Sequence, residues 1–399
     1  MSKKRTQANL PLTPSVLRWA RETTNLSAHD VAGKLKLKTI TPDTIEAWER
    51  GEGSPSLPQL EKLAYEIYKR PLALFFFPEP PEEKTPRQAF RTLPDEEIEN
   101  ISPRLRYLLR QAQVRQIYLG QLYEGVPEPD RHILRDTQLN LLTPVEVMAA
   151  RVRAYLEITL ATQSQWRNTD EAFKRWRDSL EAHGVYVFKE AFHDDSISGF
   201  CVFDRRFPVI YVNNSHADAR QIFTLFHELA HLLARTGGID KLDDQRYIRR
   251  LDGDDKRIEV FCNQFAGEFL VPGADFDRRL QQWSQVSPAM VKELARIYHV
   301  SREVILRKLL DRRRITRAEY EATVTQWKEA AQTANDEKSG GGNYYLTQGV
   351  YLSQRYLELA FGQLYQGRLS VDQLAEVLGV KPKNVPTFEA SLIHQGVVE

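Results

Sequence analysis

The stretch FTLFHELAHLLA, residues 223–234, carries two histidines four positions apart, with a glutamate directly after the first. Positions i and i+4 lie on one face of an α-helix, so His227 and His231 would present two imidazoles to one point. Neutral imidazole nitrogens bind zinc readily. Glu228 is rotated by about 100° around the helix, where it would reach a water molecule on the ion and accept its proton. The chemistry this predicts is the hydrolysis of peptide bonds.

A zinc centre of this kind requires a third ligand from the protein. The metzincin arrangement would place a histidine six positions after His231, and that position is Gly237. The next option is a carboxylate on a following helix, and Glu259 in KRIEVFCNQFAGEFLVP lies 28 residues after His231. Asn263, one helical turn further, would hydrogen-bond the ligand carboxylate or the facing backbone. The rival ligands are Asp252, Asp254, Asp255, Glu268 and Cys262.

The histidine pair and Glu259 also have a purely structural interpretation. Histidines in a buried helix can hydrogen-bond backbone carbonyls, and Glu259 can be a surface carboxylate of an amphipathic helix. The context favours the metal site, because strand-like segments precede the helix and apolar residues flank the motif on both sides.

Two stretches, IYVNNSHADARQIFTLFHELAHLL and IEVFCNQFAGEFLVP, resemble the ImmA/IrrE metallopeptidases. That family combines an asparagine-rich turn, an arginine, FT, HExxH and a later helix of the form E-x-x-x-N-x-F-A. Here FLVP replaces the usual ending of the second motif. The resemblance covers roughly residues 143–314 and implies a zincin-like fold. It also implies zinc ligation by His227, His231 and Glu259, as in gluzincins, with Glu228 as the general base.

The elements around these motifs predict a mainly α-helical protein with a small β-sheet, an α+β fold. VYVFKE, SGFCVFD and PVIYVN are short, rich in β-branched and aromatic residues, and are predicted to be strands. We predict a zinc metallopeptidase domain over residues 143–331. The other predicted parts are a proline-rich linker and helical connector over 79–142, a flexible joint over 332–343 and a helical C-terminal module over 344–399.

Residues 1–78 are predicted to form a separate domain of five short helices. The helix, turn, helix spacing is typical of a helix-turn-helix module whose third helix enters the major groove of DNA. The pattern resembles the XRE/Cro-type domain at Ala20-Arg21, Ala32, Ile45, Trp48-Glu49, Gly51, Pro55 and Leu63-Ala64. The candidate DNA-contacting residues are Lys38, Thr39, Thr41, Thr44 and Arg50.

The third helix departs from the usual pattern of DNA readers. It carries Pro42, Asp43 and Glu46 where Gln, Ser, Arg or Lys are common. Residues 1–78 contain twelve Lys and Arg against eight Asp and Glu, a net charge of +4, which is mild for a domain that binds phosphates. A helix-turn-helix fold used for dimerisation or for docking a protein is therefore the alternative.

The composition of the whole chain sets limits on its partners and setting. Its 55 Lys and Arg balance 54 Asp and Glu, so any contact with DNA must be a local patch. Two cysteines do not make a disulfide framework, which fits a reducing, cytoplasmic setting. Neither a signal peptide nor an apolar run of membrane-spanning length is expected.

Two classes of function follow from these features. In the first, the protein is a regulator that binds operator DNA as a homodimer and cleaves a specific protein partner in a stress, mobile-element or toxin–antitoxin setting. In the second, it is a non-proteolytic antitoxin or repressor whose metal site is structural or vestigial. Its partner would be a toxin such as a PIN-type ribonuclease, which the resemblance to longer ImmA/IrrE proteins implies. The intact Glu228 favours the first class, because a structural site has no use for a base there.

Overall fold

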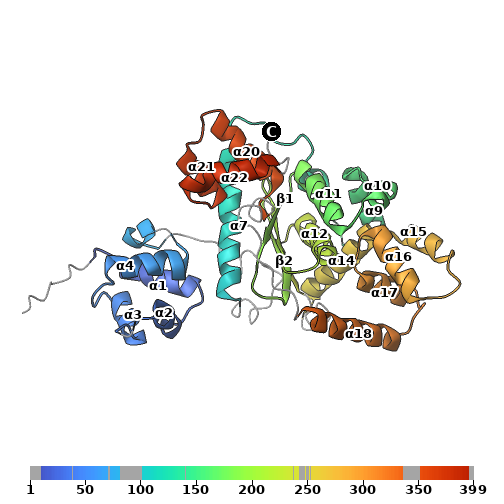
Figure 1. Ribbon diagram of the computed structural model, residues 1–399, viewed down its shortest axis with the longest axis horizontal. Helices are drawn as coiled ribbons and strands as arrows, with labels where there is room; N and C mark the ends of the chain where they lie inside the picture. The colour runs from blue at the N-terminus through green and yellow to red at the C-terminus, as the bar shows by residue number, and fades with distance from the viewer. Residues whose placement is uncertain are drawn as a thin grey trace, which may run out of the picture. The chain divides into compact units, whose positions relative to one another are not determined.

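The computed structural model describes residues 10–37, 39–70, 72–80, 101–139, 141–236, 238–241, 248, 251, 253–335 and 351–394. They fall into two units, which divide within the long helix α7 (Pro103–Leu122) after Gln111 (Figure 1). Within these ranges, none of the helices has the length and apolar character needed to cross a bilayer.

The N-terminal unit contains short helices separated by tight turns. Ser27 and Thr41 cap the second and third helices through their side chains, and Gly51, with φ of 82°, ends the third. The predicted five-helix order is present, with the fourth helix passing from α to π geometry. The elements are α1 (Pro14–Thr23), α2 (Ala28–Leu35), α3 (Pro42–Glu49), α4 (Leu57–Glu61), the π-helix η1 (Lys62–Tyr68) and the 3₁₀ helix η2 (Leu72–Phe76).

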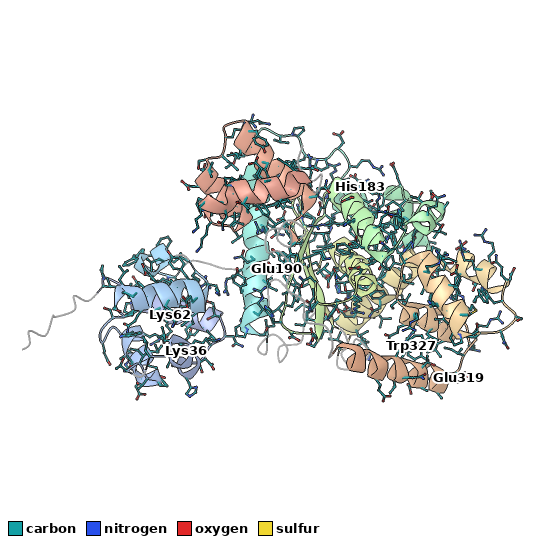
Figure 2. The ribbon with its side chains drawn as sticks, in the orientation of Figure 1. Lys36, Lys62, His183, Glu190, Glu319 and Trp327 are labelled. Atoms are coloured by element: carbon teal, nitrogen blue, oxygen red, sulfur yellow. The ribbon has the colours of Figure 1, made fainter. Side chains whose placement is uncertain are left out.

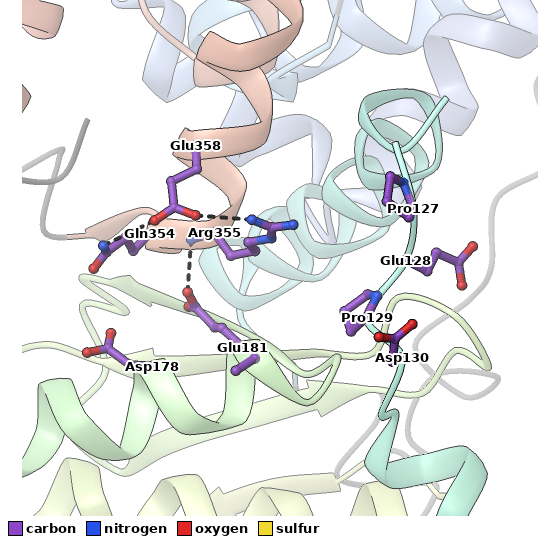
Figure 3. A pocket seen from close by; sticks show the side chains of 10 residues that line it. Pro127, Glu128, Pro129, Asp130, Asp178, Glu181, Gln354, Arg355 and Glu358 are labelled. Atoms are coloured by element: carbon purple, nitrogen blue, oxygen red, sulfur yellow. Dashed lines mark hydrogen bonds and ion pairs between the residues drawn. The ribbon is translucent and has the colours of Figure 1, made fainter. Parts of the chain in front are cut away.

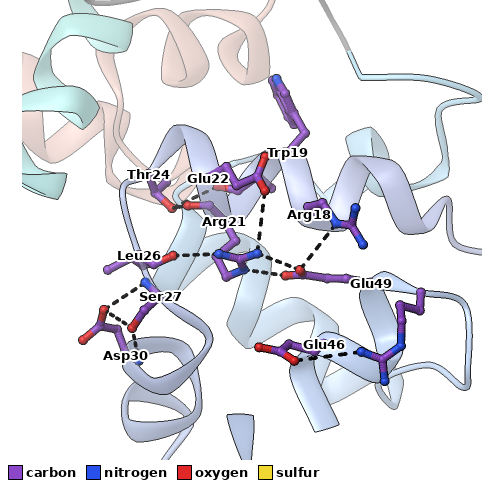
Figure 4. A network of polar contacts seen from close by, with 12 residues as sticks. Arg18, Trp19, Arg21, Glu22, Thr24, Leu26, Ser27, Asp30, Glu46 and Glu49 are labelled. Carbon is purple, nitrogen blue, oxygen red and sulfur yellow. Dashed lines mark hydrogen bonds and ion pairs between the residues drawn. The ribbon is translucent and has the colours of Figure 1, made fainter. Parts of the chain in front are cut away.

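A buried ion pair fixes α3 against α1 (Figure 4). The guanidinium of Arg21 donates to both carboxylate oxygens of Glu49, at 2.7 and 2.8 Å, and also to the Leu26 carbonyl at 3.2 Å. The Glu49 side chain is only 2% exposed, so this two-point pairing occurs largely out of water. It sets the angle at which α3, the predicted DNA-reading helix, is presented.

The second unit is built around a four-stranded mixed sheet in the order β1-β3-β2-β4. β1 and β3 pair in parallel, whereas β2 pairs antiparallel with both β3 and β4. The predicted strands correspond to β1 (Tyr186–Glu190), β2 (Ile197–Val202) and β3 (Val209–Asn213). The sequence did not indicate β4 (Gly238–Lys241), because GIDK is too short and too polar to be recognised as a strand.

The helix that carries HExxH, α12 (Asp218–Leu233), packs on one face of this sheet. Gly199 in β2 allows the close approach, because a Cβ atom there would lie 2.6 Å from the Tyr211 carbonyl oxygen and would overlap the Thr224 side chain of α12. The opposite face is aromatic: the Tyr211 ring stacks between Phe200 and Phe188, at 5.0 and 5.3 Å. The two faces therefore separate the metal motif from an aromatic core.

Further helices precede and follow the strands and confirm a mainly α-helical fold with a small β-sheet (Figure 1). Before and beside the strands lie α8 (Ile133–Asp136), α9 (Val145–Tyr155), α10 (Leu160–Gln165) and α11 (Thr169–Ala182). After them come α14 (Gly253–Leu270), α15 (Gly273–Leu280), α16 (Pro288–Tyr298), α17 (Arg302–Asp311) and α18 (Arg317–Asn335). The described C-terminal part is helical, as expected, with α20 (Gln354–Tyr365), α21 (Val371–Leu378), the 3₁₀ helix η3 (Pro382–Asn384) and α22 (Val385–His394).

A buried carboxylate joins the start of α20 to α11. Glu181 accepts hydrogen bonds from the Arg177 guanidinium at 3.1 Å and from the Arg355 backbone N–H at 3.1 Å. It lines a pocket of about 490 Å³ (Figure 3), together with Pro127, Glu128, Pro129, Asp130, Asp178, Ala182, Gln354, Arg355 and Glu358. None of the predicted site residues borders this pocket, so it is separate from the HExxH motif.

Candidate metal centre

Helices α12 and α14 bring two histidines and a carboxylate to one point. His227 and His231 project from successive turns of α12, and their Nε2 atoms are 3.2 Å apart. Glu259 approaches from α14, with Oε2 at 3.5 Å from His227 Nε2 and Oε1 at 3.3 Å from His231 Nε2. All three side chains are buried. Within the described residues, this is the group of His, Cys, Asp and Glu side chains close enough together to hold a metal ion.

The outer nitrogens of both imidazoles have their own partners. His227 Nδ1 lies 3.2 Å from the amide oxygen of Asn263, and His231 Nδ1 lies 3.3 Å from the Thr236 hydroxyl oxygen. An amide oxygen only accepts, so Nδ1 of His227 must carry the hydrogen. The Thr236 hydroxyl donates to the His231 carbonyl at 3.1 Å, so its oxygen accepts from His231 Nδ1–H. Each neutral imidazole therefore turns a lone pair on Nε2 toward the other.

This arrangement fits a divalent metal ion. Two imidazole lone pairs and a carboxylate face one another without a hydrogen between them. With both imidazoles neutral, the cluster is therefore repulsive unless a positive charge lies at its centre. Two neutral imidazole nitrogens and one carboxylate are also the donor set of a catalytic zinc site, which keeps its remaining position open. In the absence of a metal, a proton takes this place. Burial alone would lower the pKa of His227, but the Asp240 and Glu259 carboxylates outweigh it and raise that pKa to about 9.

Glu228 lies next to the cluster but outside it. It is fully buried, and neither of its oxygens makes a hydrogen bond of ordinary geometry to a described residue, although the Cys201 thiol is close enough to interact with it. Burial raises the pKa of Glu228, and the positive character of His231 and His227 opposes that change. A buried carboxylate with a raised pKa, beside a candidate metal-binding cluster, is suited to accepting a proton.

The rivals for the third ligand that the structure describes are not members of the cluster. Cys262 is buried in the apolar core and is not part of the cluster. Glu268 accepts from the ammonium group of Lys308 at 2.5 Å and from the backbone N–H of Gly273 at 2.6 Å. Asp254 pairs with Arg257, Asp255 is partly exposed on the first turn of α14, and Asp252 lies outside the described residues.

Comparison with known proteins agrees with this geometry. Residues 180–310 match the family model described as the IrrE N-terminal-like domain, a peptidase family. This segment is therefore similar to an IrrE N-terminal-like domain. Residues 17–64 match a helix-turn-helix model. The chain is also similar to the "Radiation response metalloprotease IrrE" of Deinococcus deserti, with 32% identity over 145 residues, which is 36% of this chain. The chain spans about half the length of that relative, 48%. The family implies a divalent metal.

Sequence reasoning missed two polar side chains of the IrrE-like domain. Asp240 in β4 is buried and accepts from the Thr224 hydroxyl and from the Arg220 guanidinium, both at 2.7 Å. Its negative charge raises the pKa of His227. Thr236 contacts His231, as described above. Arg220 and Thr224, which donate to Asp240, lie in the stretch that resembles the family motif. No sequence pattern marks Asp240 or Thr236 themselves, because both lie beyond the helix.

The candidate DNA-contacting residues of the helix-turn-helix domain are not equally available. Thr41 and Thr44 bond each other across the start of α3, each accepting from the backbone N–H of the other. The Arg50 guanidinium donates to both carboxylate oxygens of Glu52, at 3.1 and 2.9 Å. Thr39 is exposed, and Lys38 lies outside the described residues.

Metal binding to the IrrE-like domain is expected to strengthen as pH rises. Because the pKa of His227 is about 9 without metal, binding at pH 7 must displace about one proton. The apparent affinity should therefore rise roughly tenfold per pH unit, or about 100-fold between pH 6 and 8. Calorimetric titration in buffers of different ionisation enthalpy measures the released proton directly.

The folding stability of the metal-free protein should change with pH in the opposite direction, falling as pH rises. The folded pKa of His227 lies above its ordinary value of 6.5, so this group contributes stability that is complete below about pH 6.5 and is lost as pH rises through 9. The increase in Tm on adding zinc should therefore grow from pH 6 to 8. An affinity that stays constant over this range would contradict the assignment of a proton to the cluster.

Proposed function

We propose that this protein is a zinc-dependent endopeptidase that cleaves a specific protein partner and is joined to a DNA-binding helix-turn-helix domain. His227, His231 and Glu259 would hold the metal, with Asn263 orienting His227 from behind. The ion would supply Lewis acidity and lower the pKa of a water molecule. Glu228 would accept the proton of the attacking water and return it to the leaving amine.

The observation that carries the proposal is the full burial of Glu228 beside the candidate ligands, where the Cys201 thiol is its neighbour and neither carboxylate oxygen makes an ordinary hydrogen bond to a described residue. A buried carboxylate without ordinary hydrogen bonds destabilises a fold, and a purely structural metal site would have no use for one. Its position one residue after a metal ligand, rotated off the ligand face, suits a general base.

One of the two edge strands of the described sheet, β4, offers a place for the substrate. Gly238 in β4 packs against the His231 ring, so β4 runs beside the metal ligands. An extended peptide that adds to this edge through backbone hydrogen bonds would pass next to Glu228. The burial of the site residues, with His231 and Glu228 fully inaccessible, means that a substrate must first open the site. This favours a dedicated partner over cleavage of proteins in general.

The test combines metal analysis of the purified protein with incubation against the proteins encoded beside it. We expect about one zinc ion per chain and cleavage of one of these proteins at a defined bond, abolished by a chelator and restored by zinc. Stoichiometric zinc with binding but no cleavage of any partner would instead support the second function, a non-proteolytic antitoxin or repressor. The burial of the three candidate ligands is also compatible with this alternative.

The helix-turn-helix domain is proposed to bind operator DNA as a homodimer on a short palindromic site near its own promoter. Exposed Lys36 follows α2, while Lys62 donates to the Leu35 carbonyl at 2.8 Å (Figure 2). The acidic residues Asp43 and Glu46 of α3 oppose the approach of phosphates to the cations nearby. Weak, strongly salt-dependent binding is expected from this charge distribution.

Replacing Glu52 by Gln is expected to strengthen DNA binding. The substitution removes the carboxylate that the Arg50 guanidinium meets at two points and leaves the longer pairing with Glu46, at 3.9 Å, so Arg50 becomes more available to a phosphate. One additional phosphate contact should raise affinity several-fold at low salt and steepen the salt dependence by a slope of about 0.9. Titration of a promoter fragment at several salt concentrations measures both, with Lys36→Ala as the opposite control. If neither wild type nor Glu52→Gln retains any promoter fragment at low salt, the domain is a protein-docking module.

A further inference from the structure

The turn that ends α12 folds back onto the second histidine of the motif. Arg235 has a left-handed backbone, with φ of 58°, and its N–H bonds the Leu232 carbonyl at 2.9 Å. The N–H of Thr236 bonds the His231 carbonyl, also at 2.9 Å. This pair of bonds is the Schellman motif, in which a left-handed residue closes the last turn of a helix. His231 is therefore both a candidate metal ligand and the helical residue whose carbonyl closes the motif.

The side chain of Thr236 reaches the same residue. Its hydroxyl donates to the His231 carbonyl at 3.1 Å, and its oxygen lies 3.3 Å from His231 Nδ1. The hydroxyl hydrogen is committed to the carbonyl, so the oxygen must accept from Nδ1–H. The hydrogen of the neutral imidazole is thereby held on Nδ1, which leaves the Nε2 lone pair facing His227 and Glu259.

The residue that follows in β4 confines the ring from another side. A Cβ atom on Gly238 would lie 2.6 Å from Cγ and 2.7 Å from Nε2 of His231, closer than any real contact. The backbone of β4 therefore touches the imidazole, and the Thr236 carbonyl is near the buried Cys201 thiol, at 4.0 Å. The ring has a fixed position between this turn and α14.

We propose that Thr236 is a positioning residue of the metal centre, which selects the tautomer and the ring orientation of His231. This inference rests on the proposed metal site. Groups that hydrogen-bond the outer nitrogen of a ligating histidine orient the ring and raise its basicity, and their loss typically costs about 10–100-fold in metal affinity. Asn263 holds the same place behind His227.

The test compares Thr236→Val with Thr236→Ser. Valine keeps the branched shape and the backbone N–H that completes the Schellman motif, so it removes only the hydroxyl. Serine keeps the hydroxyl. Zinc affinity, measured by competition with a chromophoric chelator, is expected to fall about 10–100-fold in Thr236→Val and to stay within a few-fold of wild type in Thr236→Ser. Thr325→Val, on the exposed surface of α18, is the matched control and should bind zinc as wild type does.

A second pair of variants keeps the test decisive if Thr236→Val does not fold. Gly238→Ala forces a methyl group against the His231 ring and should also lower zinc affinity, whereas Gly267→Ala places its methyl in open space and should not. Wild type without stoichiometric zinc would overturn the proposed function itself. If wild type holds zinc and Thr236→Val binds it with the same affinity, only the role of this turn is overturned. Where Thr236→Val is unfolded, an unchanged affinity in Gly238→Ala has the same meaning.

Discussion

Glu228→Gln is expected to lose peptide cleavage by about 10²–10⁴-fold while its zinc content stays at that of wild type. Glutamine has nearly the same shape and cannot accept a proton at neutral pH. The native carboxylate is buried and has a raised pKa, which brings a general base closer to the working pH. Since Glu228 contributes no atom to the His227, His231 and Glu259 cluster, the metal ligands remain unchanged.

The measurement is single-turnover cleavage of the partner protein, with metal content determined on the same samples. Glu146→Gln, an exposed position on α9, is the matched control and should cleave normally. If Glu228→Gln still supports repression or toxin neutralisation in cells, proteolysis is dispensable and the protein acts by binding. Loss of those roles, with zinc and DNA binding intact, would establish a working peptidase.

His231→Ala is expected to abolish stoichiometric zinc, and His227→Ala should do the same. The free energy of zinc binding to structural sites with four protein ligands is about 10–16 kcal/mol. One ligand therefore accounts for roughly 3 kcal/mol or more, which corresponds to a loss of affinity on the order of 100-fold or more. His231 also loses its bond to Thr236 in this variant. Full zinc occupancy in His231→Ala would refute the metal site.

The control for these variants is His29→Ala, since His29 is exposed on α2 and far in sequence from the motif. The third ligand is tested separately with Glu259→Ala and Cys262→Ala. Glu259→Ala should lose zinc, because its two oxygens approach the two imidazoles at 3.5 and 3.3 Å. Retention of zinc in Glu259→Ala together with its loss in Cys262→Ala would move the third ligand to the thiol and leave the metal centre in place.

Local sequence determined much of this protein. The i, i+4 spacing of His227 and His231 places them on one face whatever surrounds the helix, because helical periodicity is a backbone property. The capping residues Ser27 and Thr41, and Gly51 after α3, set the limits of the short N-terminal helices for the same reason. The predicted strands were short and strongly β-forming, so their positions were also readable.

Tertiary structure decided the contacts that no spacing encodes. Spacing alone does not separate Glu259 from its rivals, although the family resemblance favours it. The packing of α14 against α12 is what brings Glu259 to the histidines. β4 forms because β2 offers it an edge, not because GIDK favours a strand. Its register then brings Gly238 and Asp240 to the metal ligands.

The candidate DNA-contacting residues show that the same limit holds for neighbours close in sequence. Lysines, threonines and an arginine in a helix-turn-helix are reasonable candidates by type, but Arg50 is held by Glu52 and Thr41 pairs with Thr44. Whether a polar side chain is free depends on which neighbour its rotamer reaches, and that is settled in three dimensions. Sequence therefore determined which residues are chemically able to act, and tertiary structure decided which of them have partners.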